Sequence, residues 1–277
     1  MTQPTENANW WLRKKDGEIM AYCYLCTAGT SAGRHADAHY GPEWIEANGG
    51  VDQAAQLLLD GFRHTAMDDP RALTGRLPAE VNSLARLGVT ARDRVVLFAS
   101  DTPQGQASAL AVVTYLRSQL AGLDAVAVSV PGLQVQDAAL FQRKGLANFF
   151  RLARVEINQA RPGGCSLVIT GGFKALIPYA VLLATLENLT CYSVFEHSDS
   201  LITLPPLPLT IDRETLLPFL PLLRAMAQDG SVPLKKLEAT VPDPLFRDQL
   251  ASLIEIFPDE NRVGLSTLGI LVLDALQ

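Results

Sequence analysis

A loop rich in glycine and hydroxyl side chains follows the first apolar run of the chain, and its composition suits phosphate binding. It spans residues 27–33 and contains Gly29, Thr30 and Ser31. Open α/β sheets bind ligands beyond the carboxyl ends of their strands, and backbone N–H groups and hydroxyls at such an edge donate hydrogen bonds to phosphate oxygens. Ordinary strand-to-helix turns have a similar composition, so this loop alone indicates only a candidate site.

A second loop carries a positive charge where a helix is expected to begin. It reads Thr170-Gly171-Gly172-Phe173-Lys174 and follows the apolar run Ser166–Ile169. Glycines allow a ligand to approach the backbone closely, and a helix N-terminus attracts anions. Because the helix dipole disfavours a lysine at that end, an anionic ligand explains Lys174 better than helix stability does.

A third loop, Ser100–Gly105, also leads from an apolar run into a helical pattern. Asp101, Thr102 and Gln104 are its candidate ligand-binding side chains. Asp101 or Thr102 can equally cap the helix that follows, since both residue types accept hydrogen bonds from the first-turn N–H groups. Both interpretations stay open at this point.

The first loop also matches the G-x-S-x-G pattern of a hydrolase nucleophile elbow, from Gly29 to Gly33. That elbow follows a strand deep in the sheet and needs an acid and a histidine later in the chain. Here it follows the first predicted strand, and the candidate partners are Asp137 or Glu187 with His197. Nothing in their spacing favours a triad, so we do not expect a serine hydrolase.

Other reactive patterns are weaker than the two phosphate-type loops. His35 and His39 have the i, i+4 spacing of some metal ligands. Arg34 with His39 matches the Arg/His sequence motif of HEPN ribonucleases. A polar loop over a binding site is the preferred interpretation of these residues. Cys23 and Cys26 lie in a predicted buried strand, where side chains three apart face opposite ways. We expect no metal site.

The chain contains neither G-x-G-x-x-G nor G-x-x-x-x-G-K-[ST]. These are the patterns that position dinucleotides and nucleoside triphosphates on a strand–helix turn. We therefore expect no cofactor.

Short apolar runs alternate with helical patterns over the first 210 residues. Near-continuous apolar character is typical of parallel strands that helices cover on both faces. The repeated strand–helix order predicts a Rossmann-like α/β domain over residues 1–210, with a mostly parallel sheet and helices on both faces. The predicted strands are Ile19–Thr27, Val95–Ala99, Ala125–Val130, Ser166–Thr170 and Thr190–Phe195.

The proline-rich stretch Leu204–Leu209 predicts a domain boundary, because prolines at this density interrupt helices and central strands. Residues 211–277 read as helix, short helix, helix and two short strands around 258–261, an order similar to a winged helix. This segment holds six basic and ten acidic residues. The helix in the recognition position, about Asp243–Ile256, is acidic, whereas a DNA-reading helix is basic. We expect a packing or dimerisation role.

Composition excludes several classes of protein. The 277 residues include 48% hydrophobic and 19% charged residues, which excludes a disordered chain. A net charge of −6 argues against general DNA or RNA binding, because phosphate neutralisation drives that affinity. No apolar run approaches the roughly 20 residues of a membrane span. Four cysteines in a chain of this length indicate no disulfide framework and predict a cytoplasmic protein.

The motifs of the loops, taken in order, resemble the CRISPR-associated Rossmann fold (CARF) proteins. The resemblance is to the branch of type III ring nucleases and of the sensor halves of related ribonucleases. It covers about residues 19–209, and its most specific piece is GGFKA. The matching pieces are Gly29-Thr30-Ser31, LPAEVNSL at 77–84, SDTPQG at 100–105, Gly132-Leu133-Gln134, GGFKA at 171–175 and LPPLP at 204–208.

The resemblance implies a homodimer that binds a cyclic oligoadenylate, usually cyclic tetra-adenylate, across its two-fold axis. In ring nucleases of this kind a ribose 2′-hydroxyl attacks the adjacent phosphorus without a metal, giving linear products with a 2′,3′-cyclic phosphate. Carried onto this chain, Lys174 stabilises the transition state and Ser31 orients the phosphate or the attacking hydroxyl. The remaining ligand-binding residues implied are Gly29, Thr30, Asp101, Thr102, Gln104, Thr170, Gly171, Gly172 and Phe173.

Effector members of this family carry a nuclease or membrane domain after the sensor. Here residues 211–277 contain no histidine and no membrane-type run. This favours a ring nuclease that switches off type III CRISPR signalling in antiviral defence. The alternative is a non-catalytic cyclic oligoadenylate sensor that acts through its C-terminal segment.

Overall fold

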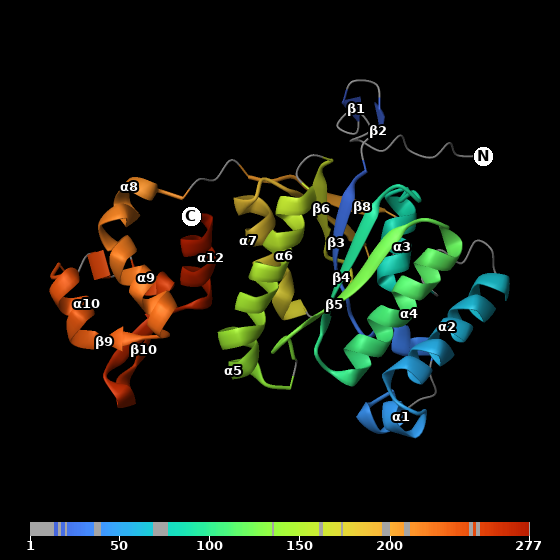
Figure 1. Cartoon of the computed structure of the whole chain (residues 1–277), viewed down its shortest axis with the longest axis horizontal. Coiled ribbons are helices and arrows are strands. Elements are labelled where there is room, and N and C mark those ends of the chain that lie inside the picture. The colour runs from blue at the N-terminus through green and yellow to red at the C-terminus, as the bar shows by residue number, and fades with distance from the viewer. Residues whose placement is uncertain are drawn as a thin grey trace.

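A six-stranded sheet in the order β5-β4-β3-β6-β7-β8 organises the first part of the chain (Figure 1). The strands β3 to β7 are parallel, and β8 joins β7 antiparallel at the edge. The strands are β3 Cys23–Thr27, β4 Arg94–Ser100, β5 Asp124–Val130, β6 Cys165–Val168, β7 Thr190–Val194 and β8 Leu201–Leu204.

The structure is a computed structural model of the chain. It describes residues 14–15, 18–19, 21–35, 40–68, 77–134, 136–160, 163–172, 174–195, 200–207, 211–243, 246–247 and 250–276.

Helices cover both faces of the sheet, as the alternating pattern predicts. In Figure 1, α1, α2, α3 and α4 lie on one side and α6 and α7 on the other. On the first side are η2 Ser31–His35, α1 Pro42–Ala47, α2 Val51–Asp68, α3 Ala79–Arg86 and α4 Pro103–Gln119. On the second are α5 Ala138–Leu140, the π-helical turn η3 Phe141–Gly145, α6 Leu146–Ala160, η4 Lys174–Leu176 and α7 Ile177–Leu186.

The alternation of side chains along the central strand divides the core into two layers. Tyr24 and Cys26 of β3 pack with α2, α3 and α4, whereas Cys23 and Leu25 pack with α6 and α7. All five residues of β3 are buried, because helices cover the strand on both faces. The Rossmann-like α/β prediction is therefore confirmed.

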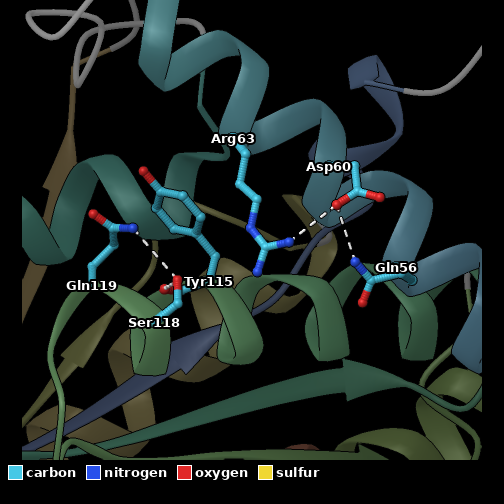
Figure 2. A network of polar contacts seen from close by, with 6 residues as sticks. All are labelled: Gln56, Asp60, Arg63, Tyr115, Ser118 and Gln119. Carbon is cyan, nitrogen blue, oxygen red and sulfur yellow. Dashed lines mark hydrogen bonds and ion pairs between the residues drawn. The ribbon is translucent and has the colours of Figure 1, made fainter.

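On the first side, helix α4 lies against β4 and β5, and helix α2 packs on α4. Phe62 meets the ring of Tyr115 edge-on, with 5.9 Å between ring centroids. Around them, Asp60 accepts hydrogen bonds from Gln56 at 3.0 Å and from Arg63 at 3.2 Å (Figure 2). Exposed contacts of this kind contribute only about 0.2–0.5 kcal/mol each, so the buried Phe62 dominates the packing of the two helices.

The C-terminal residues form a smaller unit with its own apolar cluster, which includes Leu223, Met226 and Val263. Its strands make an antiparallel sheet in the order β10-β11-β9. Its elements are α8 Arg213–Leu216, η5 Leu217–Phe219, α9 Leu220–Asp229, β9 Val232–Pro233, α10 Leu234–Thr240, η6 Ala251–Leu253, β10 Ile254–Phe257, η7 Pro258–Glu260, β11 Arg262–Leu265 and α12 Thr267–Ala275.

Helix α12 joins this unit to the sheet domain, because Leu271 is part of the apolar layer around α6 and α7. Arg154 of α6 donates to the Leu271 carbonyl at 3.2 Å and pairs with Asp274 at 3.5 Å. The two strands predicted around 258–261 are present as β10 and β11 and pair antiparallel, while the winged-helix-like architecture stays a prediction. Among the described residues, no helix is both long and apolar enough to cross a bilayer.

The structure differs from the sequence predictions in several places, and the predicted strand Ser166–Thr170 ends at Val168. The first strand begins at Cys23 instead of Ile19, which belongs to a short hairpin of β1 Lys14–Lys15 and β2 Glu18–Ile19. The predicted helix over about 243–256 does not reach Ile256, because β10 starts at Ile254 and pairs with β11. No sequence pattern indicated β8, an edge strand with residues 202–204 exposed.

Candidate functional site

The chain order of the strands places a reversal point at the carboxyl edge of the sheet. From β3 the chain adds β4 and β5 on one side, and then returns to add β6 and β7 on the other. Ligands of open α/β sheets bind at such a reversal. Here the reversal lies between β3 and β6, which are the two strands that end in the predicted phosphate-type loops.

The two loops meet at this reversal. A β-carbon on Gly29 would lie only 2.7 Å from the amide nitrogen of Gly172. The Thr27 hydroxyl donates to the Gly171 carbonyl, and Gly172 has a φ of +94°, in the region that favours glycine. The backbones of the first and second predicted loops therefore lie in close approach.

A buried carboxylate lies beneath these loops. Glu80, in the first turn of α3, is 2% exposed and accepts hydrogen bonds from the Gly29 N–H at 2.8 Å and the Ser31 hydroxyl at 3.4 Å. A β-carbon on Gly171 would overlap its Oε1 atom. Glu80 thus fixes the first loop and fills the space under the second.

Glu80 was not among the predicted site residues, although it lies within the LPAEVNSL motif. Its type suggested only a favourable first-turn charge on a helix. The signal that could have found it is a carboxylate among the apolar residues of that motif, since buried charges need hydrogen-bonding partners.

The Thr170 hydroxyl is held by the elements around it. It accepts a hydrogen bond from the Val194 N–H at 3.0 Å and shares a hydrogen bond with the Ser83 hydroxyl at 2.7 Å. Ser83 is buried on α3, so this helix contacts both loops. Thr170 therefore anchors the second loop to β7 and α3.

Lys174 is the first residue of η4 and is exposed. It stands two residues after Gly172, where the second loop meets the first. Thr30 is also exposed and Ser31 is half-buried, so both can be reached from the solvent side of the edge. Phe173 lies outside the described residues.

The third loop is tied to its neighbours by its own side chains. Asp101 accepts a hydrogen bond from the Gly132 N–H at 2.8 Å, which connects the ends of β4 and β5. Thr102 caps α4 through the Gly105 N–H at 3.2 Å, so its capping role is confirmed. The Gln104 carbonyl accepts from the Tyr40 hydroxyl at 2.7 Å.

The hydrolase-elbow pattern does not assemble a triad among the described residues. The strand before it, β3, lies deep in the sheet, so its position as first predicted strand was no argument against an elbow. The partners decide the matter: Asp137 caps α5 through the Leu140 N–H, and Glu187 pairs with Arg154 at 2.8 Å. His197 lies outside the described residues.

The cysteines are buried in the core. Cys23 and Cys26 face opposite sides of β3, as the strand pattern predicts. Burial, together with the charge of Glu80, raises the pKa of Cys26 well above its usual value, and burial raises the pKa of Cys191 to about 12. These thiols stay protonated at neutral pH and make poor nucleophiles.

The histidine pattern is only partly visible. His35 is described by its backbone, at the end of η2, and His39 lies outside the described residues. Within the part of the chain that the structure describes, no three His, Cys, Asp or Glu residues gather as a metal site would require.

Comparison with known protein families gives a match. Residues 75–207, just under half of the sequence, match the family model described as CRISPR-associated protein (Cas_APE2256). The matched stretch contains Glu80, Asp101 and Lys174, whereas Ser31 precedes it. No curated protein matches the chain.

Proposed function

The match over residues 75–207 supports a CRISPR-associated protein, and from that premise we propose that the chain is a ring nuclease. It binds cyclic tetra-adenylate between two copies of itself and cleaves it without a metal, which switches off type III CRISPR signalling. The ligand belongs at the carboxyl edge of the sheet, over the loops that contain Ser31 and Lys174.

The observation that carries this proposal is the convergence of these two loops where the strand order reverses. Gly29 and Gly172 are in close approach, Thr30 and Lys174 are exposed beside them, and N–H groups with a lysine suit phosphate oxygens. A dimer would present two such edges. This fits a cyclic ligand with two-fold symmetry and four phosphates.

The proposed reaction needs positioning and charge stabilisation. The ribose 2′-hydroxyl gives up its proton to solvent as its oxygen forms a bond to the adjacent phosphorus, the bond from phosphorus to the 5′-oxygen breaks, and the 5′-oxygen takes up a proton from solvent. Lys174 stabilises the negative charge that develops on the non-bridging oxygens. Ser31 and the glycine backbone hold the sugar and phosphate in line for attack.

Calorimetric titration with cyclic tetra-adenylate tests the binding part of the proposal. We expect micromolar or tighter binding with one ring per two chains, and a dimer by light scattering. Absence of binding at micromolar concentrations would remove the proposal. Binding at this stoichiometry without cleavage would instead identify a sensor that acts through residues 211–277.

A further inference from the structure

The hydrogen bond between Ser31 and Glu80 fixes the direction in which the Ser31 hydroxyl can act. A carboxylate accepts hydrogen bonds and has none to donate. In the pair at 3.4 Å, Ser31 is therefore the donor and Glu80 Oε2 the acceptor. A serine hydroxyl has a single hydrogen, so while this bond is made Ser31 can only accept from a ligand.

Glu80 is well placed to hold this arrangement. Its side chain is buried at 2% exposure, and Oε1 is occupied by the Gly29 N–H at 2.8 Å. The two oxygens therefore contact two residues of the same loop, which limits rotation of the carboxylate. Because the group lies under the loop, a ligand that arrives from solvent meets Ser31 and not Glu80.

We propose that Glu80 is a positioning residue that makes Ser31 a hydrogen-bond acceptor, so that Ser31 selects a ribose 2′-hydroxyl over a phosphate oxygen. This inference rests on the proposed function and assigns the group that Ser31 contacts. A phosphodiester oxygen only accepts hydrogen bonds, whereas a 2′-hydroxyl can donate one. Lys174 and the loop N–H groups are left to bind the phosphates.

The arrangement has a consequence for both specificity and rate. A site built to bind a hydroxyl discriminates against the analogue that lacks it, because its acceptor is then left unpaired. A 2′-hydroxyl that donates to Ser31 also has its oxygen lone pairs free to point at phosphorus. The same hydrogen bond thus selects a ribonucleotide ring and orients the attacking oxygen.

Glu80→Gln tests this inference because it reverses the hydrogen bond with almost no change in shape. The oxygen of the new side-chain amide can still accept from the Gly29 N–H, while the amide nitrogen donates to Ser31 Oγ and turns the Ser31 hydrogen outward. Affinities are compared for cyclic tetra-adenylate and for its all-2′-deoxy counterpart, in titrations that are short relative to turnover.

We expect wild type to prefer the ribose ring by about tenfold or more. Glu80→Gln should bring the ratio of the two affinities close to one and should slow cleavage. Glu43→Gln, which removes an exposed first-turn carboxylate from α1, should leave both unchanged. Thermal unfolding checks that each variant is folded.

Ser31→Ala provides a second readout should Glu80→Gln fail to fold. Ser31 is half-buried, and the alanine variant should lose the preference for ribose while it still binds the ring. Equal binding of both rings by wild type, or an unchanged preference for ribose in folded Glu80→Gln, would overturn this inference and leave the proposed function standing. Failure of wild type to bind either ring would remove the proposed function and this inference together.

Discussion

Gly29 and Gly172, far apart in the chain, lie so close that a β-carbon on Gly29 would come within 2.7 Å of the Gly172 amide nitrogen. The contact joins the ends of β3 and β6, which are neighbours in the sheet. Without side chains between them, the two loop backbones form a single edge. The proposed ligand site depends on this contact.

Gly171→Ala should destabilise the protein because its β-carbon would overlap Glu80 Oε1 and lie 2.8 Å from the Thr27 carbonyl oxygen. Overpacking of this kind costs about 1–3 kcal/mol, and here the rigid backbone of β3 is one of the obstacles. Urea unfolding followed by circular dichroism measures the loss.

Gly230→Ala is the matched control for that substitution. Gly230 has a φ of +74°, and a β-carbon there would have nothing within 4 Å, so alanine adds backbone strain without a clash. We expect a loss of about 1 kcal/mol with ligand binding intact. A Gly171→Ala variant that is as stable as wild type would contradict the close packing of the two loops.

The attachment of the C-terminal unit is tested at Arg154. This residue and its partner Glu187 have side chains only 12% and 11% exposed, and Arg154 also donates to the Leu271 carbonyl of α12. Arg154→Met removes the guanidinium that pairs with the buried Glu187 carboxylate, which should cost about 3 kcal/mol. Denaturant unfolding measures the change.

Arg143→Met serves for comparison, since its pair with Glu255 is 60% and 40% exposed at 3.4 Å. Exposed pairs contribute about 0–1 kcal/mol, so this variant should unfold near the wild-type midpoint. Equal losses in the two variants would show that burial of the Arg154 pair does not secure α12.

The strands of the sheet could be predicted because helices on both faces require nearly continuous apolar residues. All five predicted parallel strands exist, and the first and the fourth have shifted ends. The edge strand β8 could not be predicted in this way, because its residues 202–204 are exposed and carry no burial signal. The predicted extent of the helix at 243–256 was wrong, because β10 begins at Ile254 and pairs with β11. The local sequence pattern does not show this pairing.

The site could be predicted only as far as its loops. Glycines, hydroxyl residues and Lys174 follow the predicted strands, and these residue types suit phosphate binding. In an open α/β sheet the carboxyl ends of the parallel strands lie at one edge, where ligands bind. Glu80 could not be assigned because its role depends on α3 lying under both loops, which is a tertiary relationship. Thr102 was correctly given a capping alternative, because that contact is local in sequence.

Thiol chemistry follows from the buried cysteines. Burial raises the pKa of Cys191 to about 12, so at pH 8 iodoacetamide should label it in the native protein about 10²-fold more slowly than in denaturant. Mass spectrometry of the quenched samples measures the rates. Fast labelling of native Cys191 would contradict its burial.

The same shift gives a pH dependence. Because the pKa of Cys191 is raised in the folded state, its contribution to stability is complete below the unfolded pKa near 9. It declines as the pH rises from there toward 12. Cys191→Ala should therefore reduce the slope of unfolding free energy against pH in that range. An unchanged slope would show that the Cys191 thiol does not cause the pH dependence of stability in this range.

Lys174→Ala should separate chemistry from binding. If the ammonium acts on charge that develops during attack, the cleavage rate should fall by about 10²–10³. The dissociation constant should change much less, because loop N–H groups and the partner protomer still hold the ring. Ser31→Ala should act in the same direction with a smaller effect, since a neutral hydroxyl bonds more weakly than a charged group. Rates are taken from single-turnover cleavage and affinities from calorimetry.

The most direct test of the proposed function is incubation of radiolabelled cyclic tetra-adenylate with the wild-type protein in excess EDTA, followed by separation of the products. We expect linear products that end in a 2′,3′-cyclic phosphate, at a rate that the chelator does not change. A rate that falls in EDTA and returns with Mn²⁺ or Zn²⁺ would contradict metal-free cleavage and direct attention to His35 and His39. A ring that is bound but intact after hours would contradict the nuclease proposal outright.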